Sequence, residues 1–222
     1  ADTAVAQQVD AVMVGWGHAS ENPKLPDMLA ELSAQLGREI TFVGPTAPVM
    51  RVLGDKIGST LLAQAAEVST MPWNGDGLTA TIDENGDIPP DVFDAACIHS
   101  EAEAVEAANR IGYPVMLKAS EGGGGKGIRK ALNEEELRAG YPQVVNEVPG
   151  SPVFLMKLCS QARHLEVQII GDEHGNAIAL NGRDCSTQRR HQKIFEEGPP
   201  TIAPPEVFRQ MEQAAVRLCK EI

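Results

Sequence analysis

Residues 118–129 read K-A-S-E-G-G-G-G-K-G-I-R, and five of the six positions from 122 to 127 are glycine, with Lys126 as the sixth. Glycine buries no side chain and loses more backbone entropy on ordering than any other residue, so a packed core does not need such a run. Successive bare N–H groups beside a lysine can instead close over an anion. A flexible surface linker is the alternative, but linkers seldom follow an apolar strand such as residues 115–118. The stretch therefore predicts a loop that covers a phosphate group.

The elements around the glycines exclude two familiar nucleotide loops. Gly122, Gly124 and Gly127 satisfy the pattern G-x-G-x-x-G, but the dinucleotide fingerprint opens a helix directly. Here a strand-like run at 128–132 follows, and the helix signal begins only after it. A Walker A loop is also excluded, because Lys126 is followed by glycine rather than by Ser or Thr. The order strand, glycine loop, strand predicts a hairpin lid over a nucleotide.

The composition limits the class of protein. The 222 residues carry a formal net charge of −12, which argues against a general nucleic-acid or anionic membrane surface. Four cysteines lie far apart without a C-x-x-C pair, and we interpret them as reduced thiols in a cytosol-like compartment. An apolar run of roughly 18 residues is absent from the sequence, so we expect no membrane span.

The alternation of strand and helix signals predicts an N-terminal parallel α/β unit over residues 1–70. The expected strands are 11–14 and 40–43, and the expected helices are 26–36, 47–53 and 56–65. Residues 71–91 are rich in Gly, Pro, Asp and Asn, and they predict a surface excursion that links two domains.

The second half predicts a lid and the beginning of a third unit. Over residues 92–160, a capped helix, the glycine hairpin, a second helix and a further strand form a small α+β lid. Over residues 161–222, alternating apolar residues on either side of a turn at 172–175 predict an antiparallel hairpin. Because neither end of the chain carries a helix-cap signal, we expect a piece of a longer protein that cuts this third unit short.

The densest group of charged residues lies at 183–197, R-D-C-S-T-Q-R-R-H-Q-K-I-F-E-E. A solvated basic stripe is one interpretation. In an extended segment alternate residues share a face, which predicts an amide-rich face and a cationic face. The first would hold Gln188, Arg190 and Gln192, and the second would hold Arg189, His191 and Lys193. The cationic face suits a small oxyanion or a phosphate group.

Three further lysines are candidate anion ligands. Lys118 and Lys157 each end an apolar strand, where a charge is expensive unless it is paired or binds an anion. In the alternative, the lysine stem packs while the ammonium group reaches solvent. Lys56 stands at the start of a helix, where backbone N–H groups can also receive phosphate.

Taken in order, these motifs resemble the biotin carboxylase component of the biotin-dependent carboxylases, an ATP-grasp fold. The motifs are G-D-K at 54–56, the glycine run, R-H-L-E-V-Q at 163–168 and Q-R-R-H-Q-K at 188–193. The resemblance covers residues 9–203. The segments G-W-G-H-A-S-E-N-P-K-L-P at 15–26 and F-L-M-K-L at 154–158 are similar to the multidomain eukaryotic acetyl-CoA carboxylase branch of that family.

The resemblance implies that ATP phosphorylates bicarbonate to carboxyphosphate, which delivers CO2 to biotin on a carrier domain and leads to malonyl-CoA for fatty-acid synthesis. The implied ATP-binding residues are Lys56, Lys118, Gly122, Gly123, Gly124, Gly125, Lys126, Gly127, Lys157, His164 and Gln188. The implied catalytic residues are Lys193, which would face bicarbonate, His191 and Arg190. Trp16 and Gly17 would lie near the biotin pocket.

The resemblance also implies what this chain lacks. The two glutamates that bind Mg2+ or Mn2+, and the general base, would lie beyond residue 222, so we expect the chain alone to bind nucleotide weakly and not to turn over. The implied partners are the biotinylated carrier domain, a carboxyltransferase domain and a second copy of the parent protein, in the cytoplasm or the plastid stroma. Two alternatives stay open: a carboxylase acting on propionyl-CoA or pyruvate, and a non-catalytic ATP-grasp-like module.

Overall fold

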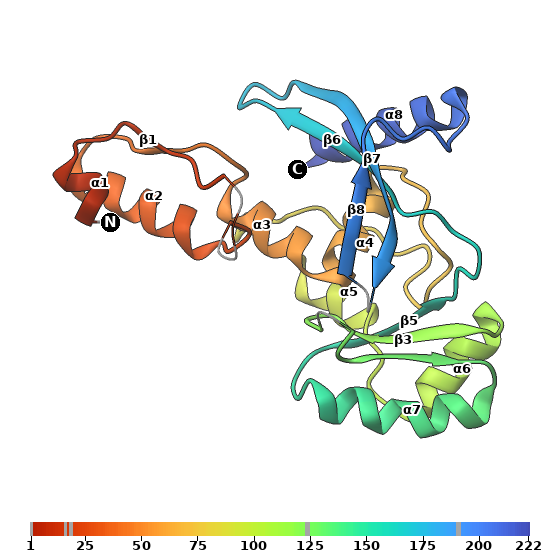
Figure 1. The fold of residues 1–222 in the computed structure, drawn as a ribbon. Helices are drawn as coiled ribbons and strands as arrows, with labels where there is room; N and C mark the ends of the chain where they lie inside the picture. The colour runs from red at the N-terminus through yellow and green to blue at the C-terminus, as the bar shows by residue number, and fades with distance from the viewer. Residues whose placement is uncertain (1, 16, 18–19, 123–124, 190–191) are drawn as a thin grey trace.

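A computed structural model describes residues 2–15, 17, 20–122, 125–189 and 192–222 (Figure 1). The described residues form three small sheets, with strand orders β1-β2, β4-β3-β5 and β6-β7-β8. The mixed α/β and α+β character expected from the sequence is confirmed.

The N-terminal unit projects away from the rest of the molecule (Figure 1). It comprises α1 (Asp2–Ala6), β1 (Ala11–Val12), α2 (Lys24–Leu36) and β2 (Thr41–Phe42). The two strands pair in parallel, as predicted, although each is only two residues long. A small core of Ala4, Leu29 and Ile40 holds the unit together.

A central layer joins the N-terminal unit to the lid. It comprises α3 (Ala47–Gly54), α4 (Lys56–Ala65), the connection 66–89 and α5 (Pro90–Ala95). The connection was expected on the surface, and this is wrong at Trp73, which is fully buried against Phe154 with ring centroids 6.2 Å apart. The Trp73 indole N–H donates to Gln64 Oε1 at 2.8 Å. Glycine, proline and asparagine indicate turns, but they do not indicate whether the chain between the turns is exposed.

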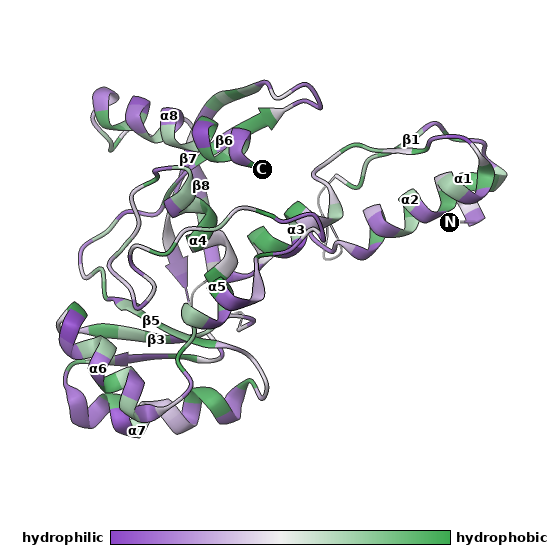
Figure 2. Cartoon of the chain, turned by 180° about the vertical axis from the view of Figure 1, so that it is seen from behind, coloured by the Kyte–Doolittle hydropathy of each residue, from purple (hydrophilic) through white to green (hydrophobic). Residues whose placement is uncertain are grey.

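The lid is the segment from α6 (Glu101–Ile111) to β5 (Val153–Lys157), with β3 (Val115–Ala119), β4 (Ile128–Ala131) and α7 (Glu134–Glu147) between them. The sheet is antiparallel, with β3 in the middle. Both helices lie on the same side of this sheet in both views (Figures 1 and 2). Because side chains alternate along β3, Val115, Leu117 and Ala119 are buried in the core cluster that contains residues of both helices, and Lys118 belongs to the other face.

The third unit is an antiparallel sheet covered by one helix. It comprises β6 (Leu165–Gly171), β7 (Ala177–Arg189), β8 (Gln192–Glu197) and α8 (Pro205–Glu221). The predicted hairpin is confirmed, but the chain reverses again between β7 and β8, so Gln188 lies opposite Lys193. The expectation of one extended segment through residues 188–193 is therefore wrong. Arg217 of α8 donates to the carbonyls of Ala66 and Glu67, which ties this unit to the end of α4.

Within the described ranges, no helix is both long and apolar enough to cross a bilayer. Figure 2 shows why for α8, the longest helix drawn, whose turns carry both hydrophilic and hydrophobic residues.

Candidate functional site

The glycine loop connects β3 and β4, as predicted, and two of its glycines are required by the local geometry. A Cβ at Gly122 would overlap the carbonyl oxygen of Lys126. Gly127 has a φ of +66°, and a Cβ there would come within 2.8 Å of side-chain carbons of Ala119 and Val148. Any larger residue at either position would push the loop away from the end of β3.

Of the other four loop residues, the structure describes Gly125 and Lys126. Gly125 also has positive φ, at +87°, and Lys126 is exposed beside it. Gly123 and Gly124, which were predicted to cover phosphate, lie outside the described residues.

The far end of the loop is anchored by Glu147, the last residue of α7. Its Oε2 accepts from the Gly127 N–H at 2.9 Å and lies 3.0 Å from Arg129 Nη1. The Gly127 N–H, followed by the charges of Arg129 and Lys126, holds the pKa of the Glu147 carboxyl below its usual value. Sequence reasoning did not identify this anchor, because nothing in the local pattern indicates that the helix end returns to the loop.

Lys56 reaches into the base of the glycine loop from the start of α4. Its Nζ donates to the carbonyl of Ser120 at 2.6 Å and also to the carbonyl of Gly122. Burial lowers the pKa of Lys56, although the neighbouring Asp55 opposes the shift. The ammonium group therefore binds backbone oxygens where a phosphate oxygen would be a stronger acceptor.

The helix start itself does not offer the phosphate donors expected from the sequence. Asp55 Oδ1 accepts from the N–H groups of Ile57 and Gly58 at 2.9 and 2.8 Å, and the Lys56 N–H donates to Ser120 Oγ at 3.1 Å. The N-cap side chain occupies the N–H groups that an anion would otherwise need at a helix N-terminus, so this part of the prediction is wrong. The Lys56 ammonium is what remains for a ligand.

Lys118 has the features of a charge kept for an anion. Its Nζ lies 2.9 Å from Met156 Sδ and 5.9 Å from the centroid of the Phe154 ring, both weak partners for an ammonium group. In the part of the chain that the structure describes, no carboxylate pairs with it. Burial, and then the positive charge of Lys56, lower its pKa. The charge of Lys56 therefore opposes protonation of Lys118, and a polyanion bound between the two ammonium groups would relieve this repulsion.

Lys157 ends the neighbouring strand but has a different environment. It lies opposite Val115 in the ladder, on the face covered by the helices. Its Nζ donates to the carbonyls of Gly112 and Tyr113 at 2.8 Å each. The structure thus gives Lys157 a structural role at the end of α6 and does not bring it together with Lys118.

A second group of predicted residues gathers on the third unit. Gln188 Nε2 lies 2.8 Å from His164 Nδ1, as expected of two residues assigned to one ligand. The Lys193 ammonium donates to Glu166 Oε2 at 2.8 Å, and this contact raises the pKa of Lys193 and lowers that of Glu166. The strands β7 and β8 extend toward the lid sheet (Figure 1). Arg190 and His191 lie outside the described residues.

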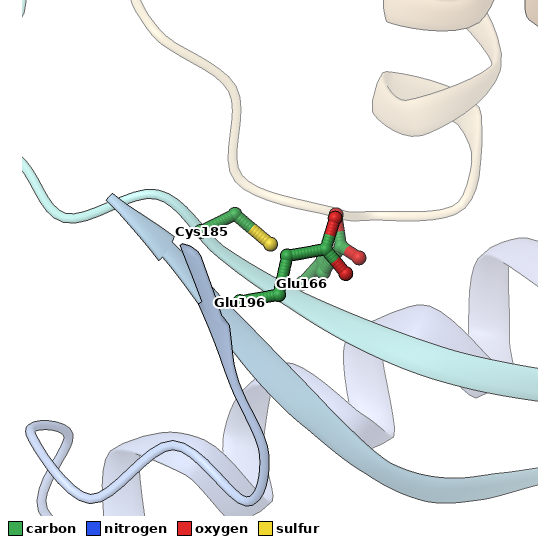
Figure 3. A group of neighbouring side chains, drawn as sticks. All are labelled: Glu166, Cys185 and Glu196. Atoms are coloured by element: carbon green, nitrogen blue, oxygen red, sulfur yellow. The ribbon is translucent and has the colours of Figure 1, made fainter. Parts of the chain in front are cut away.

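Figure 3 shows Glu166, Cys185 and Glu196, whose potential ligand atoms lie within 4.8 Å of one another. This grouping is an ion-pair network. Arg183 pairs with both carboxylates, and Lys193 pairs with Glu166, so two positive charges balance the two negative ones. A divalent cation would have to displace both of them.

Of the two residues expected near the biotin pocket, the structure describes Gly17. Gly17 is exposed, and its carbonyl accepts from Ser20 Oγ at 2.6 Å. Trp16 lies outside the described residues.

Two sequence families match the chain. Residues 84–222 match the family described as carbamoyl-phosphate synthase L chain, ATP binding domain, and residues 1–50 match the biotin carboxylase N-terminal domain. The first match, to an ATP-binding domain, covers the lid and the third unit, and the second covers the N-terminal unit.

Curated relatives are similar over the whole chain. An acetyl-CoA carboxylase of Dictyostelium discoideum is 57% identical over 221 residues, which is 100% of this chain and 10% of that protein. Acetyl-CoA carboxylase 1 of Arabidopsis thaliana is 54% identical over 222 residues, again 100% of this chain and 10% of that protein. The chain therefore spans about a tenth of the length of the curated relatives it matches.

Solved structures share the fold. The biotin carboxylase of Campylobacter jejuni, in a complex with β,γ-ATP, has a TM-score of 0.79 and 31% identity over 99% of this chain and 44% of that one. The biotin carboxylase domain of the Hydrogenobacter thermophilus 2-oxoglutarate carboxylase, crystallised with MgADP, ADP and bicarbonate, has a TM-score of 0.75 and 35% identity over the same shares. The ATP-grasp fold expected from the sequence is confirmed.

Proposed function

Because the chain belongs to the biotin carboxylase family of ATP-binding domains, we propose that it supplies the nucleotide-binding part of an acetyl-CoA carboxylase, an ATP-dependent ligase. The observation that carries the proposal is Lys118. A partly buried ammonium without a described carboxylate partner, beside a second lysine and under a glycine loop, suits the phosphate chain of ATP. The two curated relatives described above are acetyl-CoA carboxylases, which favours the acetyl-CoA branch over propionyl-CoA or pyruvate carboxylases.

In the proposed reaction, a bicarbonate oxygen attacks the γ-phosphorus of ATP, the bond to the β-phosphate oxygen breaks, and ADP leaves. The carboxyphosphate that forms splits into CO2 and inorganic phosphate, and the CO2 is taken up by a deprotonated ureido nitrogen of carrier-bound biotin. Phosphoryl transfer of this kind depends on positioning and on neutralising charge. A carboxyltransferase domain would then pass the carboxyl group to acetyl-CoA.

The residues of this chain form two groups, one that binds ATP and one that binds bicarbonate. Lys56 and Lys118 neutralise phosphate oxygens, and the glycine loop excludes water above them. His164 and Gln188, held 2.8 Å apart, offer hydrogen bonds to the nucleoside. Lys193 receives bicarbonate.

Bicarbonate has a competitor at Lys193. The ammonium group is paired with Glu166 at 2.8 Å, so bicarbonate must share or replace that carboxylate. The Glu166 carboxylate keeps the Lys193 ammonium charged and in position. Because bicarbonate has a similar geometry, it can replace this carboxylate as the partner of Lys193.

The residues fit ATP better than they fit a metal ion. Mg2+ supplies charge neutralisation on the phosphates when it is bound, and it prefers carboxylate oxygens. Among the described residues, the one close group of three potential ligands is the ion-pair network around Glu166 and Glu196. We therefore assign no metal ligand within this chain.

Substitutions at Lys193 and at Lys118 test the bicarbonate site and the ATP site separately. In the full-length protein, Lys193→Ala should abolish bicarbonate-dependent ATP cleavage and leave the Kd for ATP within about twofold, because Lys193 is assigned to bicarbonate. Lys118→Met should instead raise the Kd for ATP. Lys130→Ala, an exposed lysine on β4, is the matched control and should change neither. Unchanged turnover in Lys193→Ala would refute its role, and a wild-type protein that binds ATP without cleaving it would indicate a non-catalytic module.

A further inference from the structure

Ser120 is fully buried at the point where β3 runs into the glycine loop. Its hydroxyl donates to Asp55 Oδ2 at 2.7 Å and accepts from the Lys56 N–H at 3.1 Å. A third contact, from the Ile57 N–H, is 3.3 Å long. One hydroxyl group therefore ties the base of the loop to the first turn of α4, more than sixty residues earlier in the chain.

Asp55 divides its two carboxylate oxygens between two tasks. Oδ1 caps α4 by accepting from the N–H groups of Ile57 and Gly58. Oδ2 accepts from the hydroxyl of Ser120. The cap and the link to the loop are thus separate interactions of one side chain, and a substitution can remove one while keeping the other.

Ser120 also contacts the other end of Lys56. Its carbonyl accepts from the Lys56 ammonium at 2.6 Å, while its hydroxyl accepts from the Lys56 backbone N–H. The same residue fixes both the helix position from which the lysine starts and the direction in which its side chain points. A ligand phosphate can replace the carbonyl contact, whereas the hydroxyl contact lies within the protein and can persist.

We propose that Ser120 and Asp55 are positioning residues that hold the Lys56 ammonium under the glycine loop for the nucleotide phosphates. The inference rests on the proposed function, because it takes Lys56 to be a phosphate ligand. Small displacements of a positioned charge weaken its contribution strongly, since the interaction depends on both distance and alignment. Loss of the link should therefore weaken ATP binding even though neither side chain touches ATP.

The first test compares two buried or capping serines in the full-length protein. Ser120→Ala should raise the Kd for ATP about tenfold, which corresponds to about 1.4 kcal/mol. Ser100→Ala is the matched control: Ser100 caps α6 by accepting from the Glu103 N–H at 3.2 Å, away from Lys56. It should reduce thermal stability and leave the Kd unchanged. An equal loss of affinity in both variants would show that Ser120 acts only through general stability.

A second variant keeps the inference testable if Ser120→Ala does not fold. Asparagine is as good an N-cap as aspartate, so Asp55→Asn keeps the cap on α4. Its amide group cannot replace Oδ2 as an acceptor if Oδ1 continues to cap, and the Ser120 hydroxyl loses its partner. The Kd for ATP should rise as in Ser120→Ala, and an unchanged Kd would overturn the proposal.

A double-mutant cycle with Lys56→Met distinguishes positioning from an independent effect. If Ser120 acts through Lys56, Ser120→Ala should add less than about twofold to the Kd for ATP once Lys56 is replaced. Full additivity would overturn the inference while leaving the proposed function intact. If Lys56→Met alone leaves ATP affinity unchanged, then Lys56 is not a phosphate ligand, and that part of the proposed function fails with the inference.

Discussion

Replacing Lys118 by methionine should separate stability from nucleotide binding, because the two respond in opposite directions. The protein partners of the Lys118 ammonium are the Met156 sulfur at 2.9 Å and the Phe154 ring at 5.9 Å. A cation–π contact contributes roughly 0.5–1 kcal/mol at an exposed site and about 2 kcal/mol when desolvated, so the contact with this partly buried lysine should cost the variant at most about 2 kcal/mol. Against this loss, methionine removes a partly desolvated charge and its repulsion from Lys56. We expect equal or greater stability.

The loss of ATP affinity should be larger. A hydrogen bond from a charged donor to phosphate is worth about 1.5–3 kcal/mol, so the Kd for ATP should rise about 10- to 100-fold. Calorimetric titration of the full-length protein with ATP measures the change in affinity. Differential scanning calorimetry of the 222-residue chain measures the change in stability.

The pH dependence provides an independent check. The pKa of Lys118 in the fold is lowered from 10.5, so the unfolded chain binds more protons in the window between the lowered value and 10.5. The free energy of unfolding should therefore rise with pH through that window, and this rise should shrink in Lys118→Met. Below the window, where the lysine is charged in both states, the unfavourable contribution is fully present.

Lys157→Met is the matched control on the neighbouring strand. Its ammonium group donates to two carbonyls at 2.8 Å, so the same substitution should lower the melting temperature. A clear destabilisation by Lys118→Met together with an unchanged Kd for ATP would refute the view that the fold keeps this charge for a ligand.

Three further changes should have measurable effects. Gly122→Ala should raise the KM for ATP by more than about tenfold, because its Cβ would overlap the loop backbone, whereas Gly54→Ala, where the added carbon meets nothing within 4 Å, should not. Trp73→Ala should lower the free energy of unfolding in urea by about 3–5 kcal/mol, and a loss under about 1 kcal/mol would contradict its place in the core. In Glu166→Gln, the urea midpoint should fall below that of the wild type at neutral pH. The difference should shrink as the pH drops below 4.5, because Lys193 holds the pKa of this carboxyl down and the stabilisation disappears once the wild-type carboxyl is protonated.

Local signals in the sequence predicted most of the elements and the lid. The strands on either side of the glycine loop and the Ser100 cap follow from patterns within a few residues. The parallel pairing of the first two strands follows from the alternation of strand and helix signals along the chain. The resemblance of ordered motifs to biotin carboxylases extended these patterns to an ATP site. Two predictions from local patterns were wrong: the surface exposure of the segment that contains Trp73, and an extended chain through residues 188–193.

Chemically similar residues received different roles only in three dimensions. Lys118 and Lys157 both end apolar strands, and nothing in their sequence neighbourhoods tells them apart. The ladder register places Lys118 opposite Phe154 on the face away from the helices, and Lys157 opposite Val115 on the face beneath them. On the face beneath the helices, the Lys157 ammonium donates to backbone carbonyls. On the opposite face, the Lys118 ammonium stays available to a ligand.

The glycine hairpin and the set of cations in this ATP-grasp chain could be predicted from the amino-acid sequence, because helix period, caps and glycine conformations are properties of neighbouring residues. Which hydrogen-bond donors stay available to a ligand depends instead on how distant segments pack. The first turn of α4 could have received phosphate, but Ser120 and Asp55 occupy its N–H groups, and Glu166 already pairs with Lys193. Contacts between residues so far apart depend on how the units pack, and no local pattern encodes them.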